Sequence, residues 1–267
     1  MPLLHIAIVA LIQGITEFLP ISSSGHLILL PNLTGLADQG QAIDVAVHVG
    51  TLGAVILYFR TDVQRVIAGL PKVARRQIDD PNAALALGLI VATIPVVIAG
   101  FLMKLTNLDD AVRSIAVVGW TTLIFGLVLF WADRTGPEER TAEDWSIRHA
   151  LTMGLWQVLA LIPGTSRSGI TITGARQLGY KRHDAARLAM LMSIPTILAS
   201  GLLLGAEIAT QMNGALALDA AIGAAFAFVA AFAALHFMMR LLNSVSFTPY
   251  VIYRVILGVV LLAIAYA

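Results

Sequence analysis

Long apolar stretches alternate with short polar connections along the whole chain. Charged or turn-forming residues delimit eight such stretches, at positions 3–33, 41–59, 83–103, 112–131, 150–178, 185–205, 220–239 and 249–266. A hydrocarbon core about 30 Å thick requires roughly 20 apolar residues per helical crossing. The pattern therefore predicts an all-α integral membrane protein in which six of the stretches are ordinary transmembrane helices.

The two remaining stretches, 3–33 and 150–178, are interrupted in the middle. Each contains a proline followed by Ser, Thr and Gly residues, which deprives the backbone of helical hydrogen bonds at that point. Such a break is tolerated at membrane depth only where protein or a water-filled cavity satisfies the freed groups. We therefore expect each of these stretches to fold as a re-entrant helical hairpin.

The two breaks resemble each other at an offset of 143 residues, which pairs Pro20 with Pro163, and three plain spans follow each of them. A unit of one re-entrant hairpin plus three crossings ends on the opposite side of the membrane from its start. Two tandem units form an inverted-topology repeat whose hairpin tips meet near the midplane. The predicted organisation is a single membrane domain, 1–267, with repeats at 1–131 and 150–267 and a cytoplasmic linker at 132–149.

The distribution of Lys and Arg favours this topology, because positive charge accumulates in short cytoplasmic loops. With both hairpins re-entrant, the loops after positions 59, 131, 178 and 239 share one side and carry twelve basic residues. The opposite side carries two, Lys104 and Arg113. We expect a multi-pass protein of the cell inner membrane with its N-terminus outside.

Composition narrows the classes of function. Hydrophobic residues make up 58% and charged residues 12% of the 267 residues, whereas a soluble domain carries about 25% charged residues. The net charge is +1, and no basic run interleaved with aromatic residues is present, so the sequence predicts no nucleic-acid partner. The absence of cysteine excludes disulfides and thiolate chemistry.

Polar residues gather around the first break. Gln13 and Glu17 are spaced i, i+4 and share one helix face. An ionisable group at membrane depth costs about 2.5 to 3.5 kcal/mol on insertion scales and is a functional candidate by default. The residues that follow are Ser22, Ser23, Ser24, Gly25 and His26. Hydroxyls, free amides and a titrating imidazole suit phosphate binding and cleavage, while the serines equally suit capping of the second half-helix.

The second break places an arginine inside the membrane. Its candidate substrate-binding residues are Gly164, Thr165, Ser166, Arg167, Ser168 and Gly169. The glycines permit close backbone approach, and a guanidinium matches two phosphate oxygens. Arg167 needs an anionic partner, which is either Glu17 in the resting protein or a substrate phosphate.

Two further groups have weaker signals. Asp44 and His48 form another i, i+4 pair, with Thr51 one turn further along the same face. These residue types suit a supporting role in metal binding or proton transfer, and they equally suit a structural contact. Arg254, with Tyr250 and Tyr253 nearby, suits an interfacial anchor.

Residues 13–26 and 163–169 resemble the two signature motifs of the undecaprenyl-diphosphate phosphatase family, which is also known for bacitracin resistance. The stretches read QGITEFLPISSSGH and PGTSRSG, and supporting similarity extends over essentially the whole chain, including 44–51 and 246–254. Many members have Glu where this chain has Gln13, so Gln13 is a supporting residue.

The resemblance implies a hydrolase that removes one phosphate from a C55 polyprenyl diphosphate, regenerating the monophosphate carrier for peptidoglycan synthesis. It implies a divalent cation, Mg2+ or Ca2+, and a cation bound through Glu17 fits that reading. Carried over by position, Glu17 is the essential acid, Ser23 and His26 are candidates for nucleophile and acid/base, and Ser166 and Arg167 are phosphate ligands. The expected partners are the lipid diphosphate and membrane lipid, with a homo-oligomer left open.

The strongest alternative is a secondary transporter, because inverted repeats, broken helices and midplane polar residues are shared with that class. A flippase for the monophosphate lipid would use the same cavity. The sequence leaves open whether Ser23, His26 or water makes the attack.

Overall fold

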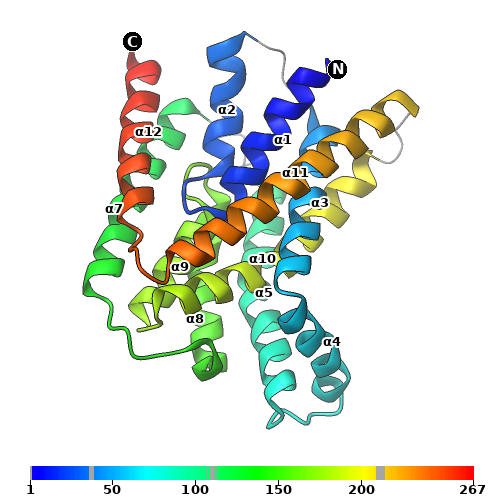
Figure 1. Ribbon diagram of the computed structural model, residues 1–267, viewed down its shortest axis with the longest axis vertical. Coiled ribbons are helices and arrows are strands. Elements are labelled where there is room, and N and C mark those ends of the chain that lie inside the picture. The colour runs from blue at the N-terminus through cyan, green and yellow to red at the C-terminus, as the bar shows by residue number, and fades with distance from the viewer. Residues whose placement is uncertain (1, 36–38, 107, 109–111, 113, 209–213) are drawn as a thin grey trace.

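The computed structural model describes residues 2–35, 39–106, 108, 112, 114–208 and 214–267 (Figure 1). The α-helices in this part of the chain are α1 (Leu3–Phe18), α2 (Ser23–Thr34), α3 (Gln41–Tyr58), α4 (Arg60–Ala74), α5 (Pro81–Leu105), α7 (Ile115–Thr135), α8 (Ile147–Val158), α9 (Arg167–Gln177), α10 (Arg182–Ile208), α11 (Gly214–Leu241) and α12 (Thr248–Tyr266). Two short 3-10 helices are η1 (Ala142–Asp144) and η2 (Leu159–Leu161). The regular structure is thus all-helical, as the sequence predicts.

Six of the described helices are long and apolar enough to cross a membrane, which confirms the predicted number of spans. They are α3, α5, α7, α10 over Arg182–Leu202, α11 and α12. Their ends differ from the sequence boundaries by a few residues, so α7 continues to Thr135 and α8 begins at Ile147, both inside the predicted linker. Arg113, which the charge distribution assigned to the outer side, lies outside the described residues.

Both interrupted stretches fold as helix pairs. The α1 helix ends at Phe18 and α2 begins at Ser23, while α8 and η2 are separated from α9 by residues 162–166. In Figure 1 the N-terminus and the far end of α2 both lie at the upper end of the molecule, with the turn between α1 and α2 in its interior. The two predicted breaks are therefore confirmed.

Small residues bring α11 against α1 and α3, and these three helices pack on one another. A Cβ atom added to Gly14 of α1 would lie 2.6 Å from the Cβ of Ala230 in α11, and one added to Gly50 of α3 would meet the Ala224 carbonyl. Membrane helices commonly use such residues for close approach, since lipid gives no hydrophobic drive to association. This packing draws α1 and α3 together on the side where Glu17 and His48 lie.

The sequence analysis assigned no element to residues 60–74, but they form the amphipathic helix α4 at the lower end of Figure 1. Asp62 of α4 accepts hydrogen bonds from Arg187 of α10, with an Oδ1 to Nη2 distance of 2.6 Å. In the last turn of α4, Lys72 donates to Asp80 at 2.5 Å, and this hydrogen bond lowers the pKa of the Asp80 carboxyl. Asp80 also caps α5 by accepting from the amides of its first turn.

A second cluster centres on Asp133 at the end of α7. Its carboxylate accepts from the fully buried Arg176 of α9 at 3.1 Å, from Arg182 of α10 at 2.8 Å and from the amide of Phe247 at 3.2 Å. These contacts join the end of α9, the start of α10 and the connection between α11 and α12. The cluster fixes the end of α9 that lies opposite Arg167.

Candidate active site

The first loop, residues 19–22, is shaped by a serine in the left-handed backbone region. Ser22 has φ 73°, and its hydroxyl accepts from the amide of Gly25 at 3.4 Å, so it caps α2. Its Oγ also lies 3.2 Å from that of Ser24. A non-glycine residue at positive φ costs roughly 1 to 3 kcal/mol and persists only where its surroundings hold it, commonly at functional sites.

The second loop, residues 159–166, repeats this arrangement. Ser166 has φ 69°, its hydroxyl accepts from the amide of Gly169 at 3.2 Å, and its Oγ lies 3.2 Å from that of Ser168. The capping serines are 144 residues apart, and α2 and α9 begin at the same separation. The offset of 143 predicted from the prolines is therefore wrong at the caps by one residue, because the second loop has one more residue between its proline and its capping serine.

Glu17, in the last turn of α1, connects the two loops. Its Oε1 accepts from Arg167 Nη2 at 2.5 Å, while its Oε2 accepts from Gln13 and Ser23 at 2.8 Å each. Glu17 is 8% exposed. The i, i+4 contact with Gln13 and the ion pair with Arg167 are both confirmed, although 150 residues separate Glu17 from Arg167.

Further contacts hold the loops against each other. The Ser168 hydroxyl donates to the carbonyl of Leu19 at 3.0 Å, and the Gly164 amide donates to Ser24 Oγ at 3.4 Å. Arg167 also donates to the carbonyl of Ser193 in α10 at 3.0 Å. The candidate residues of both motifs therefore lie in one place rather than in two separate sites.

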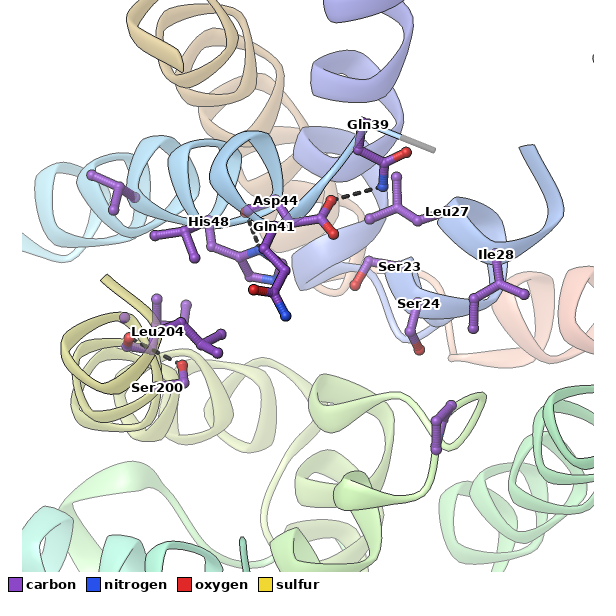
Figure 2. A pocket seen from close by; sticks show the side chains of 15 residues that line it. Ser23, Ser24, Leu27, Ile28, Gln39, Gln41, Asp44, His48, Ser200 and Leu204 are labelled. Atoms are coloured by element: carbon purple, nitrogen blue, oxygen red, sulfur yellow. Dashed lines mark hydrogen bonds between the residues drawn. The ribbon is translucent and has the colours of Figure 1, made fainter. Parts of the chain in front are cut away.

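A cavity of about 670 Å3 lies beside the loops. Figure 2 shows Ser23 and Ser24 on one side of it and Asp44 and His48 of α3 on another, with Ser200 and Leu204 of α10 opposite. Glu17 and Arg167 are not among its lining side chains. Ser23 links them to the cavity, because it lines the cavity and donates its hydroxyl hydrogen to Glu17.

The hydrogen bonds and ring contacts of His26 in the described part of the chain are made with Ser22 and Tyr253, not with Glu17 or Ser23. Its Nδ1 lies 2.7 Å from the carbonyl oxygen of Ser22 and so carries the hydrogen. In the neutral ring Nε2 then accepts from the hydroxyl of Tyr253 in α12, 2.5 Å away, and the two rings are stacked at 5.6 Å. In this arrangement the group placed to accept the Ser23 proton is Glu17.

Asp44 and His48 join the site unequally. His48 Nε2 lies 3.7 Å from Glu17 Oε2, whereas its Nδ1 contacts the backbone carbonyl of Asp44 at 2.7 Å. The carboxylate of Asp44 accepts from Gln39 at the rim of the cavity. His48 thus contacts the backbone of Asp44 through one ring nitrogen, and its other ring nitrogen lies beside Glu17.

Two residue groups of this site escaped the sequence reasoning. Arg254, expected as an interfacial anchor, is instead fully buried, and this expectation was wrong because its side chain points inward from α12 to backbone carbonyls. Thr121 and Thr122 of α7 donate to the carbonyls of Pro163 and Gly164 at 2.5 and 3.2 Å. A pair of threonines inside an apolar span is a weak signal, since threonine commonly bonds its own helix.

The described side chains do not fit the expected divalent cation in this arrangement. They contain no group of three or more His, Asp or Glu residues placed to hold a metal ion. Both carboxylate oxygens of Glu17 already accept hydrogen bonds, one of them from a guanidinium. Metal ligands of this class require oxygens free to face the cation, so we derive no chemical step through a metal.

Comparison with known proteins places these motifs in a family. Residues 6–260 match the model of the family described as bacitracin resistance protein BacA. A protein of Ruegeria pomeroyi named undecaprenyl-diphosphatase is 67% identical over 267 residues, covering all of both chains. Proteins with the same name are 67% identical in Dinoroseobacter shibae over the full length of both chains, and 46% identical in Chromohalobacter salexigens over 97% of each chain.

Proposed function

The chain belongs to the BacA bacitracin resistance family, and from that premise we propose that it is an undecaprenyl-diphosphatase. It hydrolyses the lipid diphosphate to the monophosphate and inorganic phosphate. The monophosphate then serves again as the lipid carrier in peptidoglycan synthesis, and its regeneration confers bacitracin resistance.

One observation carries this proposal. The carboxylate of Glu17 contacts the Ser23 hydroxyl at the start of α2 and the Arg167 guanidinium at the start of α9, next to the first and the second loop. An acid, a hydroxyl and a guanidinium in contact beside a cavity form a set suited to phosphoryl transfer. Ion coordination in a transporter requires no such combination.

The reaction begins when the terminal phosphate enters the cavity and replaces Glu17 as a partner of Arg167. Arg167, helped by free amides of the loops, stabilises charge on the phosphoryl oxygens. Glu17 accepts the proton of Ser23 as its oxygen forms the bond to phosphorus, and the bond to the bridging oxygen breaks to release the monophosphate lipid. Water then attacks the phosphorus of the phosphoserine, and the bond from phosphorus to the Ser23 oxygen breaks. Glu17 returns its proton to that oxygen, and inorganic phosphate leaves with the hydrogens of the water. A water molecule activated by Glu17 is the alternative attacking group.

The proposed setting is the inner membrane, with the two broken stretches re-entering as inverted-topology repeats at 1–131 and 150–267. The repeated capping geometry of Ser22 and Ser166 supports this assignment. Both chain termini lie at the upper end of Figure 1, while α4 and the α7 to α8 connection lie at the lower end. The lower end carries much of the basic excess and is therefore assigned to the cytoplasm.

Phosphate release by purified protein tests the function. We expect release from a polyprenyl diphosphate in detergent, and the same assay with chelator, Mg2+ or Ca2+ tests the divalent cation that the family resemblance implies. Absence of release under every metal condition, combined with phosphate or lipid movement in proteoliposomes, would favour transport instead.

A further inference from the structure

Arg254 is a buried cation of an unusual kind. It is fully buried in α12, and every hydrogen-bond acceptor found for it among the described residues is a backbone carbonyl oxygen. Arg176, equally buried, pairs with the carboxylate of Asp133. Removing a charge from water without an opposite charge is costly, so the contacts of Arg254 need an explanation that ordinary packing does not supply.

Those contacts reach both loops. Nη1 donates to the carbonyl of Pro20 in the first loop at 3.4 Å, and Nη2 donates to Gly164 and Thr165 in the second at 3.2 and 2.9 Å. Nε donates to the carbonyl of Thr122 in α7 at 3.1 Å. One guanidinium therefore connects the two breaks to each other and to α7, using the carbonyls that the breaks release from helical bonding.

The carbonyl contacts also fix the opposite side of each peptide. In a trans peptide the N–H points away from the C=O, so a guanidinium on the Thr165 carbonyl turns the Ser166 amide away from Arg254. No backbone acceptor is found among the described residues for the amides of Ser166, Arg167 or Ser168. These donors lie at the start of α9, and in the proposed reaction they donate to phosphate oxygens.

We infer that Arg254 is the positioning residue that holds the two loops in register, so that Glu17 and Ser23 meet Arg167 and the free amides. This inference rests on the proposed phosphatase function, but the loop contacts themselves do not. Arg254 acts through the loop backbone and touches neither Glu17 nor Ser23 in the hydrogen bonds of the described residues. Its planar fork, which lysine lacks, is what spans three loop carbonyls.

Arg254→Lys is the first test, with phosphate release and hydrogen exchange measured on the same purified protein. Lysine keeps the charge but not the fork, so kcat should fall by about 10- to 100-fold, the size of a misplacement of about 1 Å, with little change in KM. The hydrogen-bonded amides of the loops and of the turns that follow them should exchange at least about tenfold faster, because the anchors of the loop carbonyls are lost. These are the amides of Ile21, Gly25, Gly164, Thr165 and Gly169. Arg254→Met should lower kcat further.

A second variant approaches the same contact from the loop, in case Arg254 substitutions fail to fold. A Cβ at Gly169 would lie 2.7 Å from Arg254 Nη1, so Gly169→Ala should displace the guanidinium and also lower kcat. Arg176→Lys is the matched control, a buried arginine at the other end of α9. It should reduce thermal stability while leaving the kcat of the folded fraction within about threefold of wild type, since it touches neither loop.

The phosphate-release assay and the hydrogen-exchange measurement test the proposed function and the role of Arg254 separately. If wild-type protein releases no phosphate, the proposed function fails and the exchange measurement still decides the role of Arg254. Wild-type kcat in Arg254→Lys, or faster exchange confined to α12 with both loops unchanged, would overturn the inference.

Discussion

At the first residue of the half-helix that follows each break, the first loop has Ser23 and the second has Arg167. The backbone around these positions is alike, since Ser22 and Ser166 share positive φ and the same capping contact. One turn before the first break stands Glu17, and the residue 144 positions later is Leu161. The same local structure thus carries an acid and a hydroxyl in one loop and a cation in the other.

This difference shows what the repeated fold contributes and what each copy adds. The repeated part supplies capping serines, free amides and a bend in the backbone. The unrepeated side chains supply opposite charges that meet only when the loops are packed together. A composite site of this kind depends on the contact between the two loops as much as on either motif.

Reversing one charge should have the largest effect. Arg167→Glu places two carboxylates in contact in a buried site, and we expect a loss of about 3 to 5 kcal/mol in unfolding free energy together with loss of phosphate release. Thermal unfolding in detergent and phosphate release measure the two effects.

The double variant Glu17→Arg with Arg167→Glu tests whether the two positions can exchange their charges. It restores opposite charges, so we expect a melting temperature above that of Arg167→Glu but no recovery of phosphate release, because Ser23 then lies beside a cation instead of its base. Recovery of activity would show that the loops are interchangeable and would refute their division of roles.

Removing the hydroxyl at Ser23 should have the next largest effect. We expect Ser23→Ala to lower kcat by about 10²- to 10⁴-fold, because the proposed nucleophile is lost. Ser24→Ala, which also alters a hydroxyl lining the cavity, should lower it by less than about tenfold. Steady-state phosphate release by both variants gives the ratio of their kcat values. A wild-type rate for Ser23→Ala would assign the attack to water.

The capping serines should show the smallest and most equal effects. Ser22→Ala and Ser166→Ala each lose a cap worth about 1 kcal/mol, whereas glycine at either position loses less because it accepts positive φ without strain. Melting temperatures compare the four variants, with Ser114→Ala at the cap of α7 as a control outside the loops. A marked effect in one loop alone would mean that the shared backbone plan does not carry shared stability.

Much of this arrangement was predictable from local patterns. The length of the apolar stretches predicted the six spans, and the prolines predicted the two breaks. The cost of a charge at membrane depth indicated that Arg167 needs an anionic partner, with Glu17 as one of two candidates. Spacing along one helix also gave the contact between Gln13 and Glu17. Each of these depends on neighbouring residues or on the energy of a single buried charge.

The features that escaped prediction depend on packing between distant segments. Arg254 reaches loops 234 and 90 residues away, and His26 meets Tyr253 across 227 residues. The two capping serines are 144 residues apart, whereas the two prolines are 143 apart, because the second loop has one more residue between its proline and its serine. Aligning the prolines does not reveal this difference. The amphipathic helix α4 was missed because its apolar face is too short to span a membrane.

The most direct test of the composite site is the initial rate of phosphate release from a polyprenyl diphosphate by folded Glu17→Gln and Arg167→Gln proteins. Each loop supplies one of these side chains, so we predict that either change alone lowers kcat by at least about 100-fold. Lys72→Gln, which removes the ion pair between the last turn of α4 and Asp80, should stay near the wild-type rate. Retention of more than about a tenth of wild-type kcat by either loop variant would contradict the account.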